Sequence, residues 1–278
     1  MTPFEVIPGD GPIILGQPHG RTWLPEGMAD RLTPIGQALA DTDWHIGPLH
    51  DGLLPGATIV RSNVHRYVID ANRDPAGGSL YLGQNTTGLC PETDFDGAPL
   101  WQPGQAPDAD EVAERQAMYH TPYHAAMAEQ IDRVRDRYGV AILYDCHSIR
   151  SNIPFLFKGL LPVFNVGTND GHSCSVAVTD AVMAPQRASM RSTVLNGRFK
   201  GGWTTRHYGQ PGAGVHAIQM ELSQRAYLTD EAAPWDLDPV KVGRLRTLLT
   251  EVLLRLDRLA RSGAISNASA PFSEKPDA

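Results

Sequence analysis

Side chains that can bind a metal or move a proton follow three apolar runs of this sequence. His19 comes two residues after a run that ends at Gln17, His147 follows a second run, and Glu221 ends a third. If these runs are neighbouring parallel strands, their carboxyl ends meet at one edge of a sheet, where open α/β proteins bind ligands. The pattern therefore predicts one site assembled from distant segments.

Two histidines with one carboxylate form the donor set of many catalytic zinc sites, which keep a fourth position for water. His147 lies next to Asp145 in Asp-Cys-His-Ser, which favours a ligand whose ring is oriented by a nearby carboxylate. Asp41 and Asp43 are the two candidates for the third ligand. Taken alone, His19 also fits a hydrogen-bonded turn histidine, and Asp41 fits a helix N-cap.

A second histidine pair, His120 and His124, has the i, i+4 spacing that places two rings on one helix face. The pair lacks the glutamate of an HExxH motif, and Pro122 disturbs a helix at this point. We therefore favour His19 and His147 as metal ligands over this pair.

Two residues offer alternative reaction chemistries. Glu221 could take a proton from water and return it to a leaving amine, or it could form an ion pair with Arg225. Cys146 could act as a nucleophile, which would make the chain a thiol amidohydrolase. Adjacent residues of a strand point to opposite faces, however, so Cys146 and His147 cannot pair simply, and a buried structural cysteine is favoured.

Arginines near the predicted strand ends suggest an anionic substrate. Arg66 and the pair Asn72-Arg73 belong to one segment, and Arg206 to a glycine-rich segment. A guanidinium group can bind a carboxylate through two parallel hydrogen bonds, whereas the alternative for each arginine is a surface ion pair.

The composition limits the possible partners. Lys and Arg total 24 and Asp and Glu total 31, which gives a net charge of −7 and a pI of about 5.8. This charge gives no reason to expect nucleic acid or an anionic membrane as partner, and no apolar run is long enough to span a membrane. The three cysteines lack metal-site or disulfide spacing, and the amino terminus lacks the pattern of a signal peptide, so we expect a cytoplasmic protein.

Short, nearly continuous apolar runs alternate with helical patterns. Helices are expected over 110–138 and 238–261, where apolar residues recur on one stripe. The pattern predicts a three-layer α/β/α sandwich with a mostly parallel central sheet. The expected strands cover 12–17, 58–61, 66–71, 140–144, 163–166 and 216–220.

The whole chain, 1–278, is expected to form one domain. A loop rich in Gly, Pro and Asp spans about 74–108, and its aromatic residues Tyr81, Phe95 and Trp101 favour an ordered cover. The small, polar tail from 262 is expected to be frayed.

In combination, the motifs of the chain resemble the N-formylglutamate amidohydrolase (deformylase) family, which is related to zinc carboxypeptidases and aspartoacylase. The resemblance covers most of the chain, from about 18 to 228. It lies in Pro18-His-Gly, Asp41-Thr-Asp-Trp, Val68-Ile-Asp-Ala-Asn-Arg, Gly83-Gln-Asn-Thr-Thr-Gly-Leu-Cys, Asp145-Cys-His-Ser, Gly201-Gly-Trp-Thr-Thr-Arg-His-Tyr-Gly and Gln219-Met-Glu-Leu-Ser-Gln-Arg.

The resemblance implies a zinc carboxypeptidase-like fold, one catalytic Zn²⁺ and hydrolysis of N-formyl-L-glutamate to formate and L-glutamate, the last step of one route of histidine degradation. It implies that His19, Asp43 and His147 are the zinc ligands and that Glu221 is the general acid/base. Asn72 and Arg73 resemble the pair that holds a substrate carboxylate in the carboxypeptidase relatives.

Three alternatives remain at this point. One is hydrolysis of another N-acyl amino acid or a carboxypeptidase-like peptidase activity. The others are a thiol amidohydrolase that uses Cys146, and a dicarboxylate-binding protein without catalysis.

Overall fold

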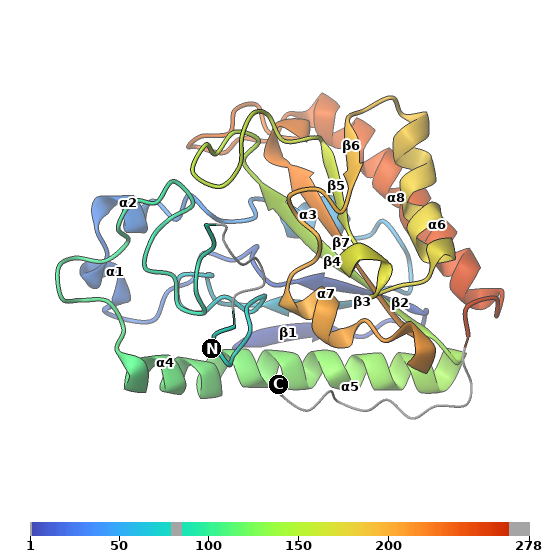
Figure 1. The fold of residues 1–278 in the computed structure, drawn as a ribbon, viewed down its shortest axis with the longest axis horizontal. Helices are drawn as coiled ribbons and strands as arrows, with labels where there is room; N and C mark the ends of the chain where they lie inside the picture. The colour runs from blue at the N-terminus through green and yellow to red at the C-terminus, as the bar shows by residue number, and fades with distance from the viewer. Residues whose placement is uncertain (1, 79–84, 267–278) are drawn as a thin grey trace.

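The computed structural model describes residues 2–78 and 85–266, and within them seven strands form one sheet in the order β1-β3-β2-β4-β7-β5-β6 (Figure 1). Neighbouring strands are parallel, except that β1 is antiparallel to β3 and β5 is antiparallel to β7. The predicted α/β class with a mostly parallel sheet is confirmed. The strands are Phe4–Ile7 (β1), Ile13–Gln17 (β2), Thr58–Ser62 (β3), Ala141–Ile149 (β4), Phe164–Gly167 (β5), Thr193–Leu195 (β6) and Val215–Ser223 (β7).

One predicted strand, 66–71, is wrong. The segment forms turns outside the sheet, although its apolar side chains are buried. Tyr67, Val68 and Ile69 pack with Leu100 and Trp101 of the long loop. A short apolar run shows that a segment is buried, but it does not show whether a neighbouring strand will bond to its backbone.

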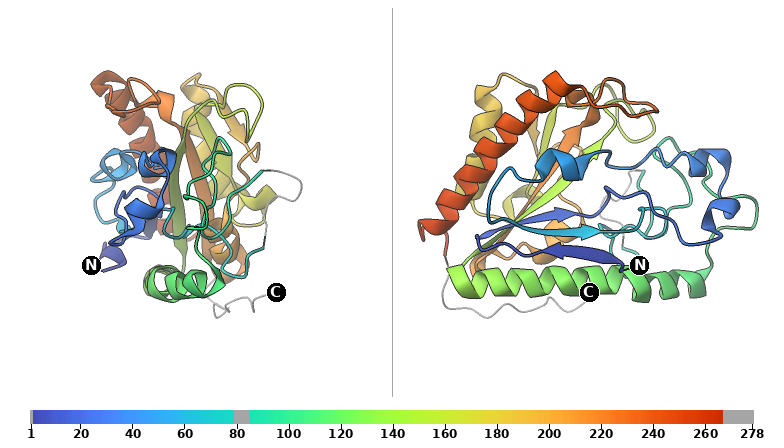
Figure 2. Two further views of the ribbon diagram at one scale, coloured as in Figure 1. Left: turned by 90° about the vertical axis from the view of Figure 1, so that its left-hand side faces the viewer. Right: turned by 180° about the vertical axis from the view of Figure 1, so that it is seen from behind.

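One face of the sheet packs against α3 (Ile46–His50), α6 (Val176–Ala188) and α8 (Pro239–Arg261). The view from behind in Figure 2 shows α8, in red, in front of the strands. Helix α8 begins after Asp238, whose carboxylate accepts hydrogen bonds from two backbone N–H groups of the first turn. Its apolar stripe is buried as the sequence predicts, and Cys146 lies in the same core.

The other face packs against α5 (Thr121–Tyr138) and α7 (Trp203–Tyr208). The predicted helix over 110–138 is observed as α4 (Ala109–Arg115), a π-helical turn (Gln116–His120) and α5. Gly139 ends α5 in the left-handed conformation, which glycine adopts at little cost. Alternate residues of β4 and β7 point to this face, including Leu143, Val215 and Ala217.

The remaining helices are short. They are α1 (Met28–Arg31), α2 (Pro34–Gln37) and the 3₁₀ turns Asn169–Gly171, Pro211–Ala213 and Gln224–Ala226.

Within the predicted 74–108 loop, Phe95, Leu100 and Trp101 are buried, so the described part of the loop is a packed cover. Tyr81 and residues 267–278 of the predicted tail lie outside the described residues. In the part of the chain that the structure covers, no helix is long and apolar enough to cross a membrane.

Candidate metal centre and substrate cavity

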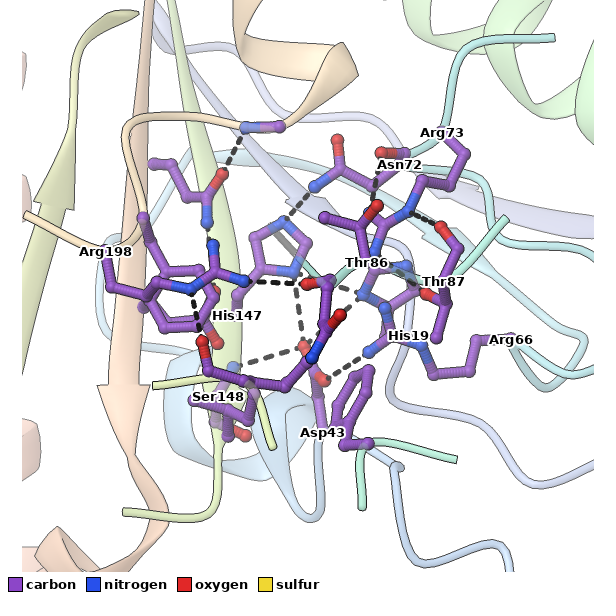
Figure 3. A pocket seen from close by; sticks show the side chains of 18 residues that line it. His19, Asp43, Arg66, Asn72, Arg73, Thr86, Thr87, His147, Ser148 and Arg198 are labelled. Carbon is purple, nitrogen blue, oxygen red and sulfur yellow. Dashed lines mark hydrogen bonds and ion pairs between the residues drawn. The ribbon is translucent and has the colours of Figure 1, made fainter. Parts of the chain in front are cut away.

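Three buried donor atoms converge on the α5 side of the sheet. His19 Nδ1 lies 3.2 Å from His147 Nδ1, and Asp43 Oδ2 lies 3.3 Å from His147 Nδ1 and 3.7 Å from His19 Nδ1 (Figure 3). All three side chains are buried. Among the described residues, they are the one group whose arrangement could hold a metal ion.

A carboxylate orients each histidine ring from the far side. His19 Nε2 lies 2.7 Å from Asp70 Oδ1, and His147 Nε2 lies 3.0 Å from Asp145 Oδ2. In a neutral ring the Nε2–H group donates to that carboxylate, which leaves Nδ1 as a lone-pair donor toward the centre. The position of Asp70 beside His19 was not predicted, because its only signal in the sequence is its place two residues before Asn72.

The donor set fits a zinc ion. Ligand atoms about 2.0–2.1 Å from a tetrahedral zinc lie about 3.3 Å from one another, close to the separations of these three atoms. Three lone-pair acceptors repel one another unless a cation or a proton lies between them. Asp43 Oδ1, moreover, is buried without a hydrogen-bond partner.

The electrostatics of the centre favour a charged carboxylate. Burial alone would raise the pKa of Asp43, but the neighbouring rings of His147 and His19 hold it well below the usual range. Burial likewise opposes ionisation of Asp70, and the charges of Arg66 and Arg73 hold its pKa well below the ordinary value. Asp43 is therefore ionised, which is the form of a carboxyl group that binds a metal ion.

Elements from distant parts of the chain place the three ligands. His19 follows the end of β2, and its carbonyl accepts a hydrogen bond from the Asp43 backbone N–H, 3.1 Å away. Asp43 precedes α3, and its Oδ2 accepts a hydrogen bond from the Ser148 backbone N–H of β4. Gly20 allows this close approach, because a Cβ there would lie 2.6 Å from Ile46.

Asp41 lies apart from this group. Its Oδ2 accepts a hydrogen bond from the Phe95 backbone N–H of the cover loop, and burial raises its pKa to about 6. The geometry thus brings Asp43, not Asp41, to the two histidines.

Glu221 lies beside the candidate metal group, which consists of His19, Asp43 and His147. It is paired in register with His147 across β4 and β7, and its side chain lines the same cavity. Burial raises the pKa of Glu221 to about 8, although the charge on His147 opposes the shift. Gln219 donates a hydrogen bond to Glu221 Oε2 at 3.0 Å, and Gln219 Oε1 accepts from the Gly202 N–H. Glu221 is therefore held in place as a carboxyl group able to exchange a proton near neutral pH.

The centre opens into a cavity that is partly open to solvent. Arg66, Asn72 and Arg73 line it, as the sequence predicts. Arg66 donates to Asp70 at 2.7 Å, and its guanidinium lies over the ring of Phe95. Arg73 is held through Nε and Nη2 by the Thr87 carbonyl and hydroxyl of the cover loop.

Two further arginines, Arg198 and Arg206, differ in their position relative to this cavity. Arg206 is not among the cavity-lining residues, and its Nε donates to the Gly201 carbonyl. Arg198 does line the cavity, and it donates to the carbonyl oxygens of Leu156 and Asn85. Arg198 could not be predicted from the sequence, because it belongs to no recognisable motif and follows β6, an edge strand that was not predicted.

The alternative nucleophile and the second histidine pair lie elsewhere. The Cys146 thiol is buried in the core on the opposite face, where burial raises its pKa well above the usual value. The Nε2 atoms of His120 and His124 each face a backbone carbonyl oxygen and do not face each other. Neither set belongs to the metal group.

Comparisons with known proteins identify the family of this chain. The family model of the N-formylglutamate amidohydrolases matches residues 11–228. The N-formylglutamate deformylase of Pseudomonas aeruginosa is 45% identical over 253 residues, which cover 88% of this chain and 94% of that protein. The N-formylglutamate deformylase of Pseudomonas putida is 42% identical over 226 residues, which cover 81% of this chain and 84% of that protein.

A solved structure supports the fold. The crystal structure of an N-formylglutamate amidohydrolase from Ralstonia eutropha JMP134 superposes with a TM-score of 0.79 at 24% identity, covering 95% of this chain and 100% of that chain. The family model spans most of the sequence, and both bacterial deformylases are similar across it. This chain therefore belongs to the N-formylglutamate amidohydrolase family.

Proposed function

We propose that this protein is a zinc-dependent amidohydrolase that cleaves N-formyl-L-glutamate to formate and L-glutamate. The observation that carries the proposal is the convergence of His19, Asp43 and His147 within a cavity that arginines also line. The names of the two Pseudomonas relatives support the substrate. We also propose that the fold is a three-layer sandwich of the zinc carboxypeptidase type and that the reaction ends a route of histidine degradation.

His19, Asp43 and His147 would hold the zinc ion, with Asp70 and Asp145 orienting the two rings. When bound, zinc polarises a carbonyl group and lowers the pKa of water. The chain supplies the proton transfer. Glu221 would accept the proton of the attacking water and return it to the departing glutamate nitrogen, which breaks the C–N bond.

Arginines would bind the rest of the substrate. Arg66 lies beside Asp43 at 3.6 Å and would stabilise the developing oxyanion. Asn72 and Arg73 would bind one carboxylate of the substrate. The second carboxylate has two candidates, Arg206 from the sequence and Arg198 from the cavity wall.

Metal analysis together with product assays tests the proposal. We expect one zinc per chain, loss of activity on chelation, and recovery when zinc is added. N-formyl-L-glutamate should be hydrolysed faster than N-acetyl-L-aspartate or a dipeptide, a comparison that separates the related amidase and peptidase activities. His147→Ala should lose both zinc and activity, whereas full zinc content in a folded His147→Ala protein would remove this residue from the ligand set.

A matched cysteine variant tests the thiol reaction. Cys146→Ala should keep most of the turnover, because the thiol lies in the core on the other side of the sheet. An inactive, well-folded Cys146→Ala protein with normal zinc content would contradict the metal mechanism.

A further inference from the structure

His120, the last residue of the π-helical turn, and His124 of α5 lie directly behind the Asn72-Arg73 segment. His120 Nε2 lies 3.1 Å from the carbonyl oxygen of Arg73, and His124 Nε2 lies 2.7 Å from the carbonyl oxygen of Ala71. Both histidines are buried. Because a carbonyl only accepts, each Nε2 carries the proton and donates.

These hydrogen bonds take the place of the backbone hydrogen bonds that a neighbouring strand of a sheet would provide. The segment over 66–73 forms turns and has no strand partner, so its buried carbonyl groups need other donors. The Asn72 carbonyl, which lies between those of Ala71 and Arg73, also has a donor, because the Trp203 backbone N lies 3.5 Å from its oxygen. Donors on the π-helical turn, α5 and α7 therefore bond to three successive carbonyl groups of the segment.

Aromatic packing fixes the orientation of the two rings. The ring centroids of His120 and His124 lie 4.4 Å apart, and Trp203 packs against both at 5.5 and 4.6 Å. Tyr208 Oη lies 3.1 Å from His124 Nδ1. Burial lowers the pKa of both histidines, which keeps the rings neutral with one donor each.

The side chains of Asn72 and Arg73 line the cavity. Asn72 Oδ1 accepts a hydrogen bond from the Thr204 N–H at 2.9 Å, and its Nδ2 lies 3.2 Å from His147 Nε2. Figure 3 shows Asn72 and Arg73 beside the metal group. A rotation of the peptide groups at Ala71 or Arg73 would move both side chains, so the backbone bonds control their direction.

We propose that His120 and His124 are positioning residues, whose hydrogen bonds to Arg73 and Ala71 fix the backbone that aims Asn72 and Arg73 at a carboxylate of the substrate. The inference rests on the proposed function, since the carboxylate is that of N-formyl-L-glutamate. It assigns a role in substrate binding to a pair of histidines whose spacing alone suggests a metal site.

Paired substitutions test the hydrogen bonds. His120→Leu and His124→Leu remove the donor, whereas His120→Gln and His124→Gln keep an amide N–H at a similar distance from the backbone. We expect each leucine variant to raise KM for N-formyl-L-glutamate roughly tenfold with kcat within about threefold, and the glutamine variants to restore most of the affinity. Zinc content should stay at the wild-type level.

His216→Leu is a matched control, because His216 is also buried and its Nε2 also faces a backbone carbonyl, that of Ile265. It lies at the opposite end of β7 from Glu221, so we expect lower stability with an unchanged KM.

In an Arg73→Met background, the leucine variants should add little to KM, because the side chain that the two histidines position is gone.

Amide hydrogen exchange gives a readout that does not need turnover. Exchange of the Asn72 and Arg73 N–H groups, which are bonded to Asp70, should accelerate in the leucine variants and not in His216→Leu. If a leucine variant does not fold, an asparagine variant, whose amide is too short to reach the carbonyl, takes its place.

No hydrolysis of N-formyl-L-glutamate by the wild type would refute the proposed function, and the exchange data would still test the positioning. Unchanged KM and unchanged exchange in both leucine variants, or equal KM increases in the leucine and glutamine variants, would overturn the inference.

Discussion

Histidine residues take different roles in this molecule according to what faces their two nitrogens. His19 and His147 direct Nδ1 toward Asp43 and Nε2 toward a second carboxylate, which suits a metal ligand. His120 and His124 direct Nε2 toward backbone carbonyl groups, which suits an anchor. The identity of the residue leaves this choice open, and its neighbours determine it.

A substitution at Glu221 tests the proposed mechanism through a single side chain. Glu221→Gln keeps the size and the hydrogen-bonding capacity but removes the ability to accept a proton. We expect kcat to fall by about 10² or more, with zinc content and KM nearly unchanged. Steady-state kinetics and metal analysis check this, and a loss of zinc would instead make Glu221 a metal ligand.

A purely structural role for Glu221 would give a different result. If the residue only formed an ion pair with Arg225, the Gln variant would be less stable but would turn over normally. Near-normal kcat with intact zinc would contradict the proposed acid/base role.

Arg198 is expected to contribute to substrate selection. Its guanidinium lines the cavity and is held by two carbonyl groups, so little conformational freedom is lost when it binds an anion. Arg198→Met should lower kcat/KM for N-formyl-L-glutamate by about tenfold or more, and that for N-formyl-L-glutamine much less. The same substitution at Arg206 determines which arginine has this role, and a larger loss in Arg206→Met would favour the prediction from the sequence.

At the level of secondary structure, β4 and β7 form the frame of the site. Side chains alternate across a strand, so His147 and Asp145 share the face on which Glu221 and Gln219 lie one strand away. Gly16 on β2 leaves room for this arrangement, because a Cβ there would lie 3.1 Å from Asp145 Oδ1. Register pairing thus brings a metal ligand next to the proposed acid/base residue.

The start of α7 constrains Asn72, and this constraint can be tested. A Cβ at Gly202 would lie 2.3 Å from Asn72 Nδ2 and 2.5 Å from its Oδ1. Gly202→Ala should therefore displace Asn72 and raise KM for N-formyl-L-glutamate about tenfold. Gly243→Ala on α8, where a Cβ meets nothing within 4 Å, is the control. Equal KM values for the two variants would contradict the assignment.

Helix α3 carries a buried histidine that should make stability depend on pH. Burial lowers the pKa of His50 from 6.5 to about 4, and its Nδ1 donates to the Ile46 carbonyl. Between these values the unfolded chain binds a proton that the folded chain does not, so the free energy of unfolding falls as pH drops from about 6.5 to about 4.

The measurement compares melting temperatures at pH 7.5 and pH 5. His50→Asn keeps a donor for Ile46 but cannot titrate, so its melting temperature should fall less than that of the wild type. The exposed His172 gives a control variant, His172→Asn, with a wild-type fall. An equal fall in His50→Asn would show that this residue does not contribute.

For the whole molecule, the metal group connects three parts of the chain that are far apart in sequence. A cation bound there should stabilise the folded protein, because the unfolded chain does not hold the three ligands together. Zinc at about 100 times its Kd should add about 2.7 kcal/mol to the free energy of unfolding of the metal-free protein. Thermal unfolding with and without zinc checks this, and His147→Ala should lose the effect. Equal stabilisation of His147→Ala would place the ion elsewhere.

The sequence by itself determined the features that repeat over short distances. The apolar stripes of 110–138 and 238–261 predict the helices that form around α5 and α8, because helical periodicity is a local property. The runs that end before His19 and Glu221 likewise predict β2 and β7. The motifs containing these residues were also sufficient to indicate the family.

Only the tertiary structure decided which side chains meet. It brought Asp43 rather than Asp41 to the histidines, and it placed Arg198 in the cavity. It also showed that 66–71 is buried without being a strand and that His124 of α5 bonds to the Ala71 carbonyl at its end. The physical reason is that contacts between distant segments depend on strand order, register and loop packing, and a local sequence pattern carries little information about any of these.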